Sequence, residues 1–331
     1  MATANSLVFV QIVFRHGNRT PATSFPTDKH KDNHFKPYGQ GQLTHQGKKE
    51  SFSLGKILRG LYGSLLGDEY DPDVLYSVTS GMARTELTLQ CVHAGLFPIR
   101  KDKQLEEGLT WQPILYDVYP KSGDKYLAYH RYNNSLLDVH RKLDPETQKL
   151  YDYVSQHAGT KIQTSHCFFK VQNAIQVQAE LGLEPPSWAK SIPSEVMMDH
   201  TLNFWEDLAT LRLPDVAGPL VQLITNNFNA KVNSDKGFEE RKICLFSGHD
   251  LNIVALLGAF NSFKRKYTGY CSFIAMELHL IDEKYFVKIV FQNGLDETTR
   301  KPLKIIPSMS EDFCTLDEFI NATKWLYTSE S

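Results

Sequence analysis

Mainly apolar runs alternate with segments of helical periodicity in the first hundred residues. Residues 7–14 and 74–78 are such runs, and they are typical of strands that are buried on both faces of a parallel sheet. A segment whose apolar residues recur every three or four positions follows each run, the first beginning at Thr44 and the second covering 87–96. This strand–helix–strand–helix order predicts a parallel sheet.

The pattern changes between Lys101 and Pro214, where strand signals nearly vanish. Helices are expected over residues 145–156, 168–183 and 194–211, separated by proline-rich turns. After this region the chain alternates again between helices and strands. The expected elements are a helix over 219–228, a strand over 243–246, a helix over 252–260, and strands over 272–280 and 285–291 joined as a hairpin.

The pattern as a whole predicts an α/β fold with an insertion. We expect residues 1–100 and 215–331 to form a doubly wound, mostly parallel sheet flanked by helices. Residues 101–214 are expected to form a largely α-helical cap inserted into that core.

Composition narrows the class of protein. Apolar residues make up 41% and charged residues 22% of the 331 positions, as in ordinary globular proteins. The formal charge of −2 argues against nucleic-acid binding through bulk electrostatics. No apolar run approaches the ~20 residues that a membrane-spanning helix needs, so no membrane span is expected.

Charged and imidazole side chains follow three of the predicted strands, at the point where each strand ends. They are Arg15, His16 and Arg19 after the first strand, Arg84 after the second, and His249 and Asp250 after strand 243–246. Because the carboxyl ends of parallel strands meet at one edge of a sheet, we expect these six residues to converge on one crevice.

The chemistry of these residues points to a phosphate site. Guanidinium groups bind phosphate in bidentate geometry, and nearby arginines lower the pKa of His16 below its reference value of about 6.5. A neutral imidazole in mild acid is a nucleophile, and Asp250 is placed to act as a general acid. A histidine–aspartate pair at a strand end is more often a helix cap, but its combination with three arginines favours catalysis.

Other phosphatase designs do not fit the sequence. None of the five cysteines has an arginine six positions later, and no glycine-rich nucleotide-binding loop occurs. No Asp/His cluster resembles a two-metal phosphatase site, so neither a metal nor a cofactor is expected.

The motifs resemble those of the histidine acid phosphatase family, branch 2 of the histidine phosphatase superfamily. Arg15-His16-Gly17-x-Arg19-x-Pro21 is similar to its signature, and Ser247-Gly248-His249-Asp250 is similar to its second motif. The resemblance extends over nearly the whole chain. It includes Gly41-Gln42-Leu43-Thr44-x-x-Gly47, Arg84-Thr85, residues 109–114, Pro186-Ser187-Trp188 and residues 275–290, the last being most similar to insect venom-type acid phosphatases.

The resemblance implies a role for each strand-end residue. His16 would be the nucleophile that forms a phosphohistidine, and Asp250 would be the general acid. The phosphoryl oxygens would be held by Arg15, Arg19, Arg84 and His249. The family works in acid on small phosphorylated substrates, and many animal members are dimeric and are secreted or lysosomal.

The cysteines depart from the family pattern. The chain has Cys91, Cys167, Cys244, Cys271 and Cys314, but Ser310 stands where relatives have a partner for Cys314, and a cysteine near Asn134 is absent. Disulfide pairing therefore stays open, and so does the compartment: secreted or lysosomal with a leader outside this chain, or cytoplasmic. Asn133 and Asn321 lie in glycosylation sequons.

We therefore predict a metal-independent acid phosphatase that hydrolyses phosphate monoesters, with a homodimer as a possible assembly. Two alternatives remain open at this point: a catalytically weak salivary or venom-type protein that binds a phosphorylated ligand, and a phosphomutase of the same superfamily. The natural substrate is left open, with specificity assigned to loop residues 23–38 and 101–132. Trp111, Trp188 and Trp205 are expected to pack in the core or cap.

Overall fold

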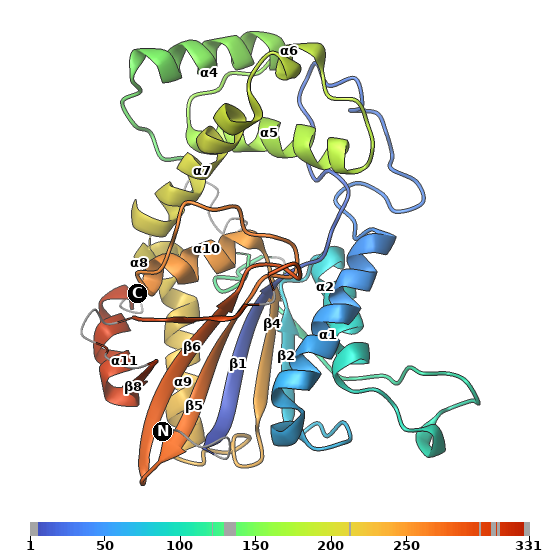
Figure 1. Ribbon diagram of the computed structural model, residues 1–331, viewed down its shortest axis with the longest axis vertical. Coiled ribbons are helices and arrows are strands. Elements are labelled where there is room, and N and C mark those ends of the chain that lie inside the picture. The colour runs from blue at the N-terminus through green and yellow to red at the C-terminus, as the bar shows by residue number, and fades with distance from the viewer. Residues whose placement is uncertain are drawn as a thin grey trace.

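A single mixed sheet of eight strands forms the centre of the molecule (Figure 1). The computed structural model describes residues 6–120, 122–128, 137–211, 213–297, 299–305, 309 and 312–327. The strand order is β3-β2-β4-β1-β5-β6-β7, and β8 pairs with β6. The strands are β1 (Leu7–Arg15), β2 (Leu75–Thr79), β3 (Asp117–Val118), β4 (Ile243–Gly248), β5 (Phe273–Ile281), β6 (Lys284–Gln292), β7 (Lys301–Leu303) and β8 (Phe313–Thr315).

The sheet has a parallel half and an antiparallel half. Strands β3, β2, β4 and β1 pair in parallel, whereas β5, β6, β7 and β8 join by antiparallel pairing. The predicted hairpin between β5 and β6 turns at Asp282 and Glu283, which both adopt positive φ. The parallel half carries all of the strand ends that the sequence singles out.

Helices cover both faces of the sheet, which confirms the predicted α/β class. One face is covered by α1 (His45–Leu66) and α2 (Ala83–Leu96), and the other mainly by α9 (Gly218–Val232), α10 (Asp250–Ala259) and α11 (Leu316–Thr323) (Figure 1). The side chains of β1 alternate between two cores. Val10, Ile12 and Phe14 pack with α1 and α2, while Phe9 and Val13 pack with the opposite layer.

A separate layer of helices lies over the carboxyl ends of the parallel strands (Figure 1). It contains α4 (Pro145–Ala158), α5 (Ser165–Glu180), α6 (Ser187–Lys190) and the start of α7 (Ser194–Leu211), which descends with the short α8 (Leu213–Val216) toward the sheet. These helices share their own hydrophobic cluster, which includes Phe25 from the polar loop after β1. That loop is also tied to α5 by Gln178, whose Nε2 donates to Asp28 Oδ2 at 2.7 Å.

The segment between α2 and the cap differs from the expectation of a helical region. It contains only the short 3₁₀ turn η1 (Lys101–Lys103) before β3, which pairs with the core strand β2. Trp111 lies on this extended arm and is 47% exposed, so the prediction that it packs in the core or cap is wrong. Trp205 of α7 is fully buried as expected.

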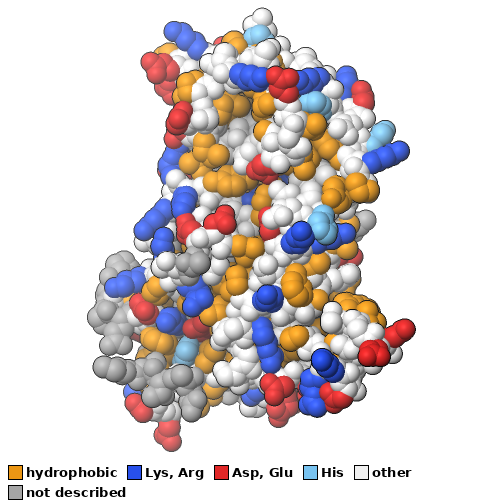
Figure 2. Space-filling model, turned by 45° about the vertical axis from the view of Figure 1, so that its right-hand side comes forward, with side chains coloured by type: hydrophobic (Ala, Val, Ile, Leu, Met, Phe, Trp, Pro, Cys, Tyr) orange, Lys and Arg blue, Asp and Glu red, His pale blue; other side chains and the backbone are white. Residues whose placement is uncertain are grey.

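The surface and helix lengths complete the picture. On the face drawn in Figure 2, basic and acidic side chains are interspersed. Within the described residues, no helix combines the length and apolar character needed to cross a membrane. The 3₁₀ turn η3 (Lys324–Leu326) follows α11 and packs against α9.

Candidate active site

The carboxyl ends of β1, β2 and β4 lie level with one another beneath the cap. Arg15 is in register with Gly248, and Thr79 is in register with Ser247. The structure therefore brings all six strand-end residues of the sequence prediction to one edge of the sheet. The cap helix α5 supplies further side chains to the same edge.

His16 follows β1 directly and is only 2% exposed. Its Nδ1 lies 2.8 Å from the carbonyl oxygen of Gly17, an acceptor that requires a proton on Nδ1. The lone pair of a neutral His16 is consequently on Nε2. The His16 ring meets the ring of His249 edge-on, with centroids 5.6 Å apart.

The pKa of His16 is held well below its usual value of 6.5. Burial is the largest cause, because it disfavours the charged imidazolium, and the positive charges of Arg84, Arg15 and Arg19 add to it. The predicted direction is confirmed. The imidazole therefore stays neutral in mild acid, which is the state that a nucleophile requires.

A close crossing of two backbones fixes the loop that carries His16. A Cβ on Gly17 would lie 2.4 Å from the carbonyl oxygen of Gly47, and one on Gly47 would lie 2.0 Å from that of Asn18. Thr44 caps α1 at this crossing, accepting from the Gly47 amide at 3.0 Å. Both glycines are thus required where the first turn of α1 meets the loop.

Arg15 is fully buried between two aromatic rings. Its guanidinium carbon lies 4.3 Å from the ring centre of Tyr270 and 5.5 Å from that of Tyr267. Its Nη1 donates to the carbonyl oxygen of Thr268, and its Nη2 lies 3.0 Å from Oδ2 of Asp250. We refer to Tyr267 and Tyr270 as the aromatic clamp.

Arg19 is oriented by a side chain from the cap. Its Nη2 donates to Oδ1 of Asn173 on α5 at 2.9 Å, and its Nη1 donates to the carbonyl oxygen of Thr20 at 3.0 Å. The sequence analysis missed Asn173. An amide in the middle of an amphipathic helix carries no signal that separates it from its neighbours.

Arg84 and His249 are in contact at the ends of β2 and β4. Nη2 of Arg84 lies 3.4 Å from Nδ1 of His249, and the other ring nitrogen of His249 lies 2.9 Å from Oγ of Ser80. Because a guanidinium only donates, this geometry fits a neutral His249 that donates from Nε2 to Ser80. Ser80 is a second residue that the sequence analysis missed.

Asp250 occupies the first position of α10, where the helix N-terminus favours negative charge. One carboxylate oxygen pairs with Arg15, and the other accepts from the amide of Leu251 at 2.9 Å. A carboxyl group thus lies beside a pocket of arginines and a neutral imidazole. This set can bind a phosphoryl group, attack it and protonate a leaving oxygen.

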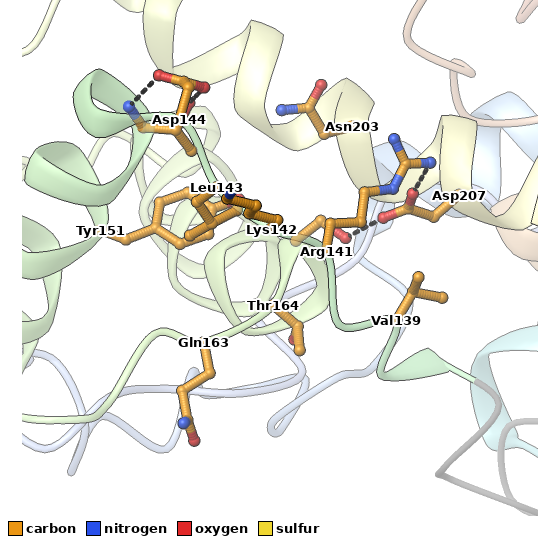
Figure 3. A pocket seen from close by; sticks show the side chains of 12 residues that line it. Val139, Arg141, Lys142, Leu143, Asp144, Tyr151, Gln163, Thr164, Asn203 and Asp207 are labelled. Carbon is orange, nitrogen blue, oxygen red and sulfur yellow. Dashed lines mark hydrogen bonds and ion pairs between the residues drawn. The ribbon is translucent and has the colours of Figure 1, made fainter.

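The cap has a cavity of its own that shares none of these residues. Its volume is about 190 Å³, and Arg141 of its wall points toward the buried Asp207 of α7, with which it forms an ion pair (Figure 3). Asp207 also accepts from Ser165 Oγ at 2.5 Å. These contacts join the start of α5 to α7 and hold the cap together.

Two sequence questions concern cysteines and metals. All five cysteines lie in described parts of the chain, and each is a free thiol. Within the described ranges, no group of three His, Cys, Asp or Glu side chains gathers closely enough to hold a metal ion.

Comparison with known proteins identifies the family of the chain. A sequence model of the histidine phosphatase superfamily (branch 2) matches residues 6–180. The venom acid phosphatase Acph-1 of Apis mellifera is 30% identical over 306 residues, covering 88% of this chain and 79% of that protein. The lysosomal acid phosphatase of Homo sapiens is 26% identical over 341 residues, covering 97% of this chain and 78% of that protein.

Solved structures support the fold. The apo form of Hafnia alvei phytase matches with a TM-score of 0.68 at 15% identity, covering 99% of this chain and 98% of that one. The resemblance expected from the sequence motifs is confirmed.

Proposed function

The chain belongs to branch 2 of the histidine phosphatase superfamily and is an acid phosphatase, and from this premise we propose that it hydrolyses small phosphate monoesters through a phosphohistidine on His16, without a metal ion. The observation that carries the proposal is the buried His16 itself. Its Nδ1 donates a hydrogen bond to the Gly17 carbonyl oxygen, the pKa of its imidazole is lowered, and arginines surround it.

In the first step, the lone pair on Nε2 of His16 attacks phosphorus. A P–N bond forms while the P–O bond to the alcohol breaks. Asp250, in the protonated form that the second step regenerates, gives its proton to the departing oxygen. Arg15, Arg19, Arg84 and His249 hold the phosphoryl oxygens and offset the charge that develops on them.

In the second step, the Asp250 carboxylate takes a proton from a water molecule while the oxygen of that water attacks phosphorus. The P–N bond breaks, inorganic phosphate leaves, and His16 returns to its neutral state. Three guanidinium groups supply the positive charge that a metal supplies in other phosphatases, which supports the metal-independent assignment.

Replacement of His16 by alanine tests the nucleophile. We expect His16→Ala to lose about 10³-fold or more of kcat, while His45→Ala, a change at an exposed histidine, retains activity. A labelled phosphate that stays on the wild-type protein in alkaline quench and is released by acid would identify the P–N bond. An active His16→Ala variant contradicts the proposal.

The leaving group tests Asp250. We expect Asp250→Asn to slow an alkyl phosphate such as glycerol phosphate far more than p-nitrophenyl phosphate, whose leaving group needs little protonation. Equal losses for the two substrates argue against a general acid. Release of free phosphate, rather than transfer to a second hydroxyl, separates hydrolysis from the phosphomutase alternative, and turnover itself separates it from ligand sequestration.

We propose that the helical part of residues 101–214, from α4 to the start of α7, acts as a cap that sets substrate specificity over the core formed by 1–100 and 215–331, to which β3 adds a strand. The position of α5 above the strand ends supports this division (Figure 1). Exchange of cap residues that do not contact the arginines is expected to change relative kcat/KM values among monoesters while p-nitrophenyl phosphate turnover persists.

A homodimer is proposed through the arm between α2 and β3. Large apolar side chains are exposed along this arm, at Leu105, Leu109, Trp111, Leu115 and Val118, and β3 ends the described sheet. We expect sedimentation to give a dimer mass for wild type and a monomer mass for Trp111→Glu with Leu115→Glu. The control Trp325→Glu with Leu280→Glu, at two other exposed apolar positions, should remain dimeric.

A secreted or lysosomal location is proposed from the venom and lysosomal relatives. Asn321 is exposed on α11, and Asn133 lies outside the described residues. A glycan on Asn321 of protein from the native source would support the proposal. The five free thiols favour the cytoplasmic alternative, which an unmodified Asn321 would strengthen.

A further inference from the structure

A larger cavity than that of the cap adjoins the loop between α10 and β5. Its volume is about 540 Å³, within the range of about 300–1,000 Å³ typical of small-molecule sites. None of the six strand-end residues lines it. It is therefore distinct from the phosphate site, although Thr268 of its wall also accepts a hydrogen bond from Arg15 through its carbonyl oxygen.

The rim of this cavity is strongly basic for a chain of net charge −2. Four lysines line it, namely Lys264, Lys266, Lys301 and Lys304, against the single carboxylate of Glu297. Lys266 and Lys301 share Glu297, whose Oε2 lies 3.9 Å from the Lys301 ammonium. Lys264 forms no ion pair with any described residue, so positive charge remains for an anionic ligand.

The floor of the cavity is apolar. Leu257 and Leu303 are buried beneath it, and Phe291 of β6 is partly exposed to it. A ligand that covers these side chains removes apolar surface from water, which stabilises its binding by about 25 cal/mol per Å² of apolar surface buried. A plain inorganic anion would leave this floor uncovered.

One wall is fixed by hydrogen bonds before any ligand binds. Asn293, at the end of β6, accepts from the Gly269 amide at 2.9 Å and from Ser272 Oγ at 3.0 Å, and it donates to the Tyr267 carbonyl at 3.0 Å. This lowers the entropic cost of forming a binding site, because the loop that carries Thr268 is already ordered.

We propose that this cavity binds a small amphipathic anion, with an acidic head at the lysines and a short alkyl chain or aromatic ring on the floor of Leu257, Phe291 and Leu303. The concave shape and modest volume fit a small molecule, and the excess of lysine over carboxylate fits a negative head. The site is independent of the proposed phosphohistidine chemistry.

Octane-1-sulfonate is a suitable probe, and calorimetry on the whole protein with saturating inorganic phosphate keeps the catalytic pocket occupied. We expect one sulfonate per chain to bind, with methanesulfonate binding at least about tenfold more weakly because it lacks the chain. The variant Lys264→Gln with Lys301→Gln should weaken octanesulfonate about tenfold. The matched control Lys56→Gln with Lys149→Gln, two exposed helix lysines, should leave its affinity unchanged.

Three results would overturn the proposal. Displacement of octanesulfonate by phosphate would assign its binding to the catalytic pocket. Equal affinities of the variant Lys264→Gln with Lys301→Gln and of the control variant would assign octanesulfonate binding to another surface. Absence of binding to wild type would show that the cavity does not bind this class of ligand. Phosphatase activity is measured in parallel. If the variant Lys264→Gln with Lys301→Gln keeps this activity, the result on octanesulfonate binding is independent of the test of His16 as the nucleophile.

Discussion

At the residue scale, Arg15 is held on several sides before any substrate arrives. The ring of Tyr270 lies on it at 4.3 Å, Asp250 pairs with Nη2, and the Thr268 carbonyl accepts from Nη1. Tyr267 is itself stacked on the buried Trp205 with centroids 5.0 Å apart. The aromatic clamp thus fixes the guanidinium without using up all of its donors.

Removal of one ring of the clamp tests its positioning role. We expect Tyr270→Ala to weaken inhibition by inorganic phosphate about tenfold, because a buried cation–π contact contributes on the order of 1–2 kcal/mol. Tyr270→Phe keeps the ring and loses only the bond from the hydroxyl to Glu180, 3.2 Å long, so it should bind phosphate almost as wild type does. Similar losses in both variants would mean that the hydroxyl, and not the ring, positions Arg15.

The lowered pKa of His16 was only partly predictable from the sequence. Arg15 and Arg19 beside it in the chain already predict a lowered pKa. Burial is nevertheless the largest cause, and it arises from residues distant in the sequence, since the rings of His249 and Tyr270 lie beside the imidazole. The burial of His16 could therefore not be predicted from the seven-residue motif alone.

At the element scale, α5 connects the cap to the catalytic loops. Asn173 binds Arg19. About two helical turns later on α5, the Glu180 carboxylate accepts from the Tyr270 hydroxyl and from Asn18 Nδ2, the latter at 3.3 Å. The cap therefore orients groups on two loops of the core as well as enclosing them.

Shortening of Asn173 tests this connection. Asn173→Ala removes the acceptor of Arg19 Nη2, and we expect kcat/KM for p-nitrophenyl phosphate to fall about tenfold, mainly through KM, since a hydrogen bond to a charged group contributes about 1.5–3 kcal/mol. Lys170→Ala, at an exposed position three residues earlier on α5, serves as the control and should have little effect. A fall in kcat alone, with KM unchanged, would contradict a role in holding the ground-state phosphate.

Elements with strong periodicity were predictable, and those set by tertiary context were not. The helix expected over 194–211 matches α7 at both ends, and the strand expected over 7–14 matches β1 to within one residue. The two-residue β3 exists only because β2 offers it an edge. The contact between Asn173 and Arg19 spans 154 positions, so no local pattern marks it.

At the scale of the whole molecule, two sheet cores and a cap cluster meet at the strand ends. The parallel half of the sheet brings three segments, near positions 15, 80 and 249, to one level. The order of strands and helices predicted this convergence, because parallel pairing places carboxyl ends together. The packing of the loop after β1 against the cap was not predictable, since its polar composition indicates only a loop.

The same burial that keeps histidines neutral makes the fold sensitive to acid. His93 of α2 is 3% exposed, and burial lowers its pKa to about 3, against about 6.5 in the unfolded chain. Between these two pKa values the unfolded state binds a proton that the native state does not bind. The contribution of His93 to the free energy of unfolding is therefore present above pH 6.5 and is lost as pH falls from 6.5 toward 3. Between pH 7 and pH 5 this one residue should cost about 2 kcal/mol of unfolding free energy.

His93→Leu removes the titrating group from a site where the described residues offer Nε2 no hydrogen bond. We expect urea unfolding of this variant to lose about 2 kcal/mol less than wild type between pH 7 and pH 5. The variant His45→Gln, at an exposed histidine, serves as the control and should reproduce the wild-type difference. An unchanged pH dependence in His93→Leu would show that His93 accepts its proton in the folded protein, and the acid sensitivity would then belong to His16 and the carboxylates.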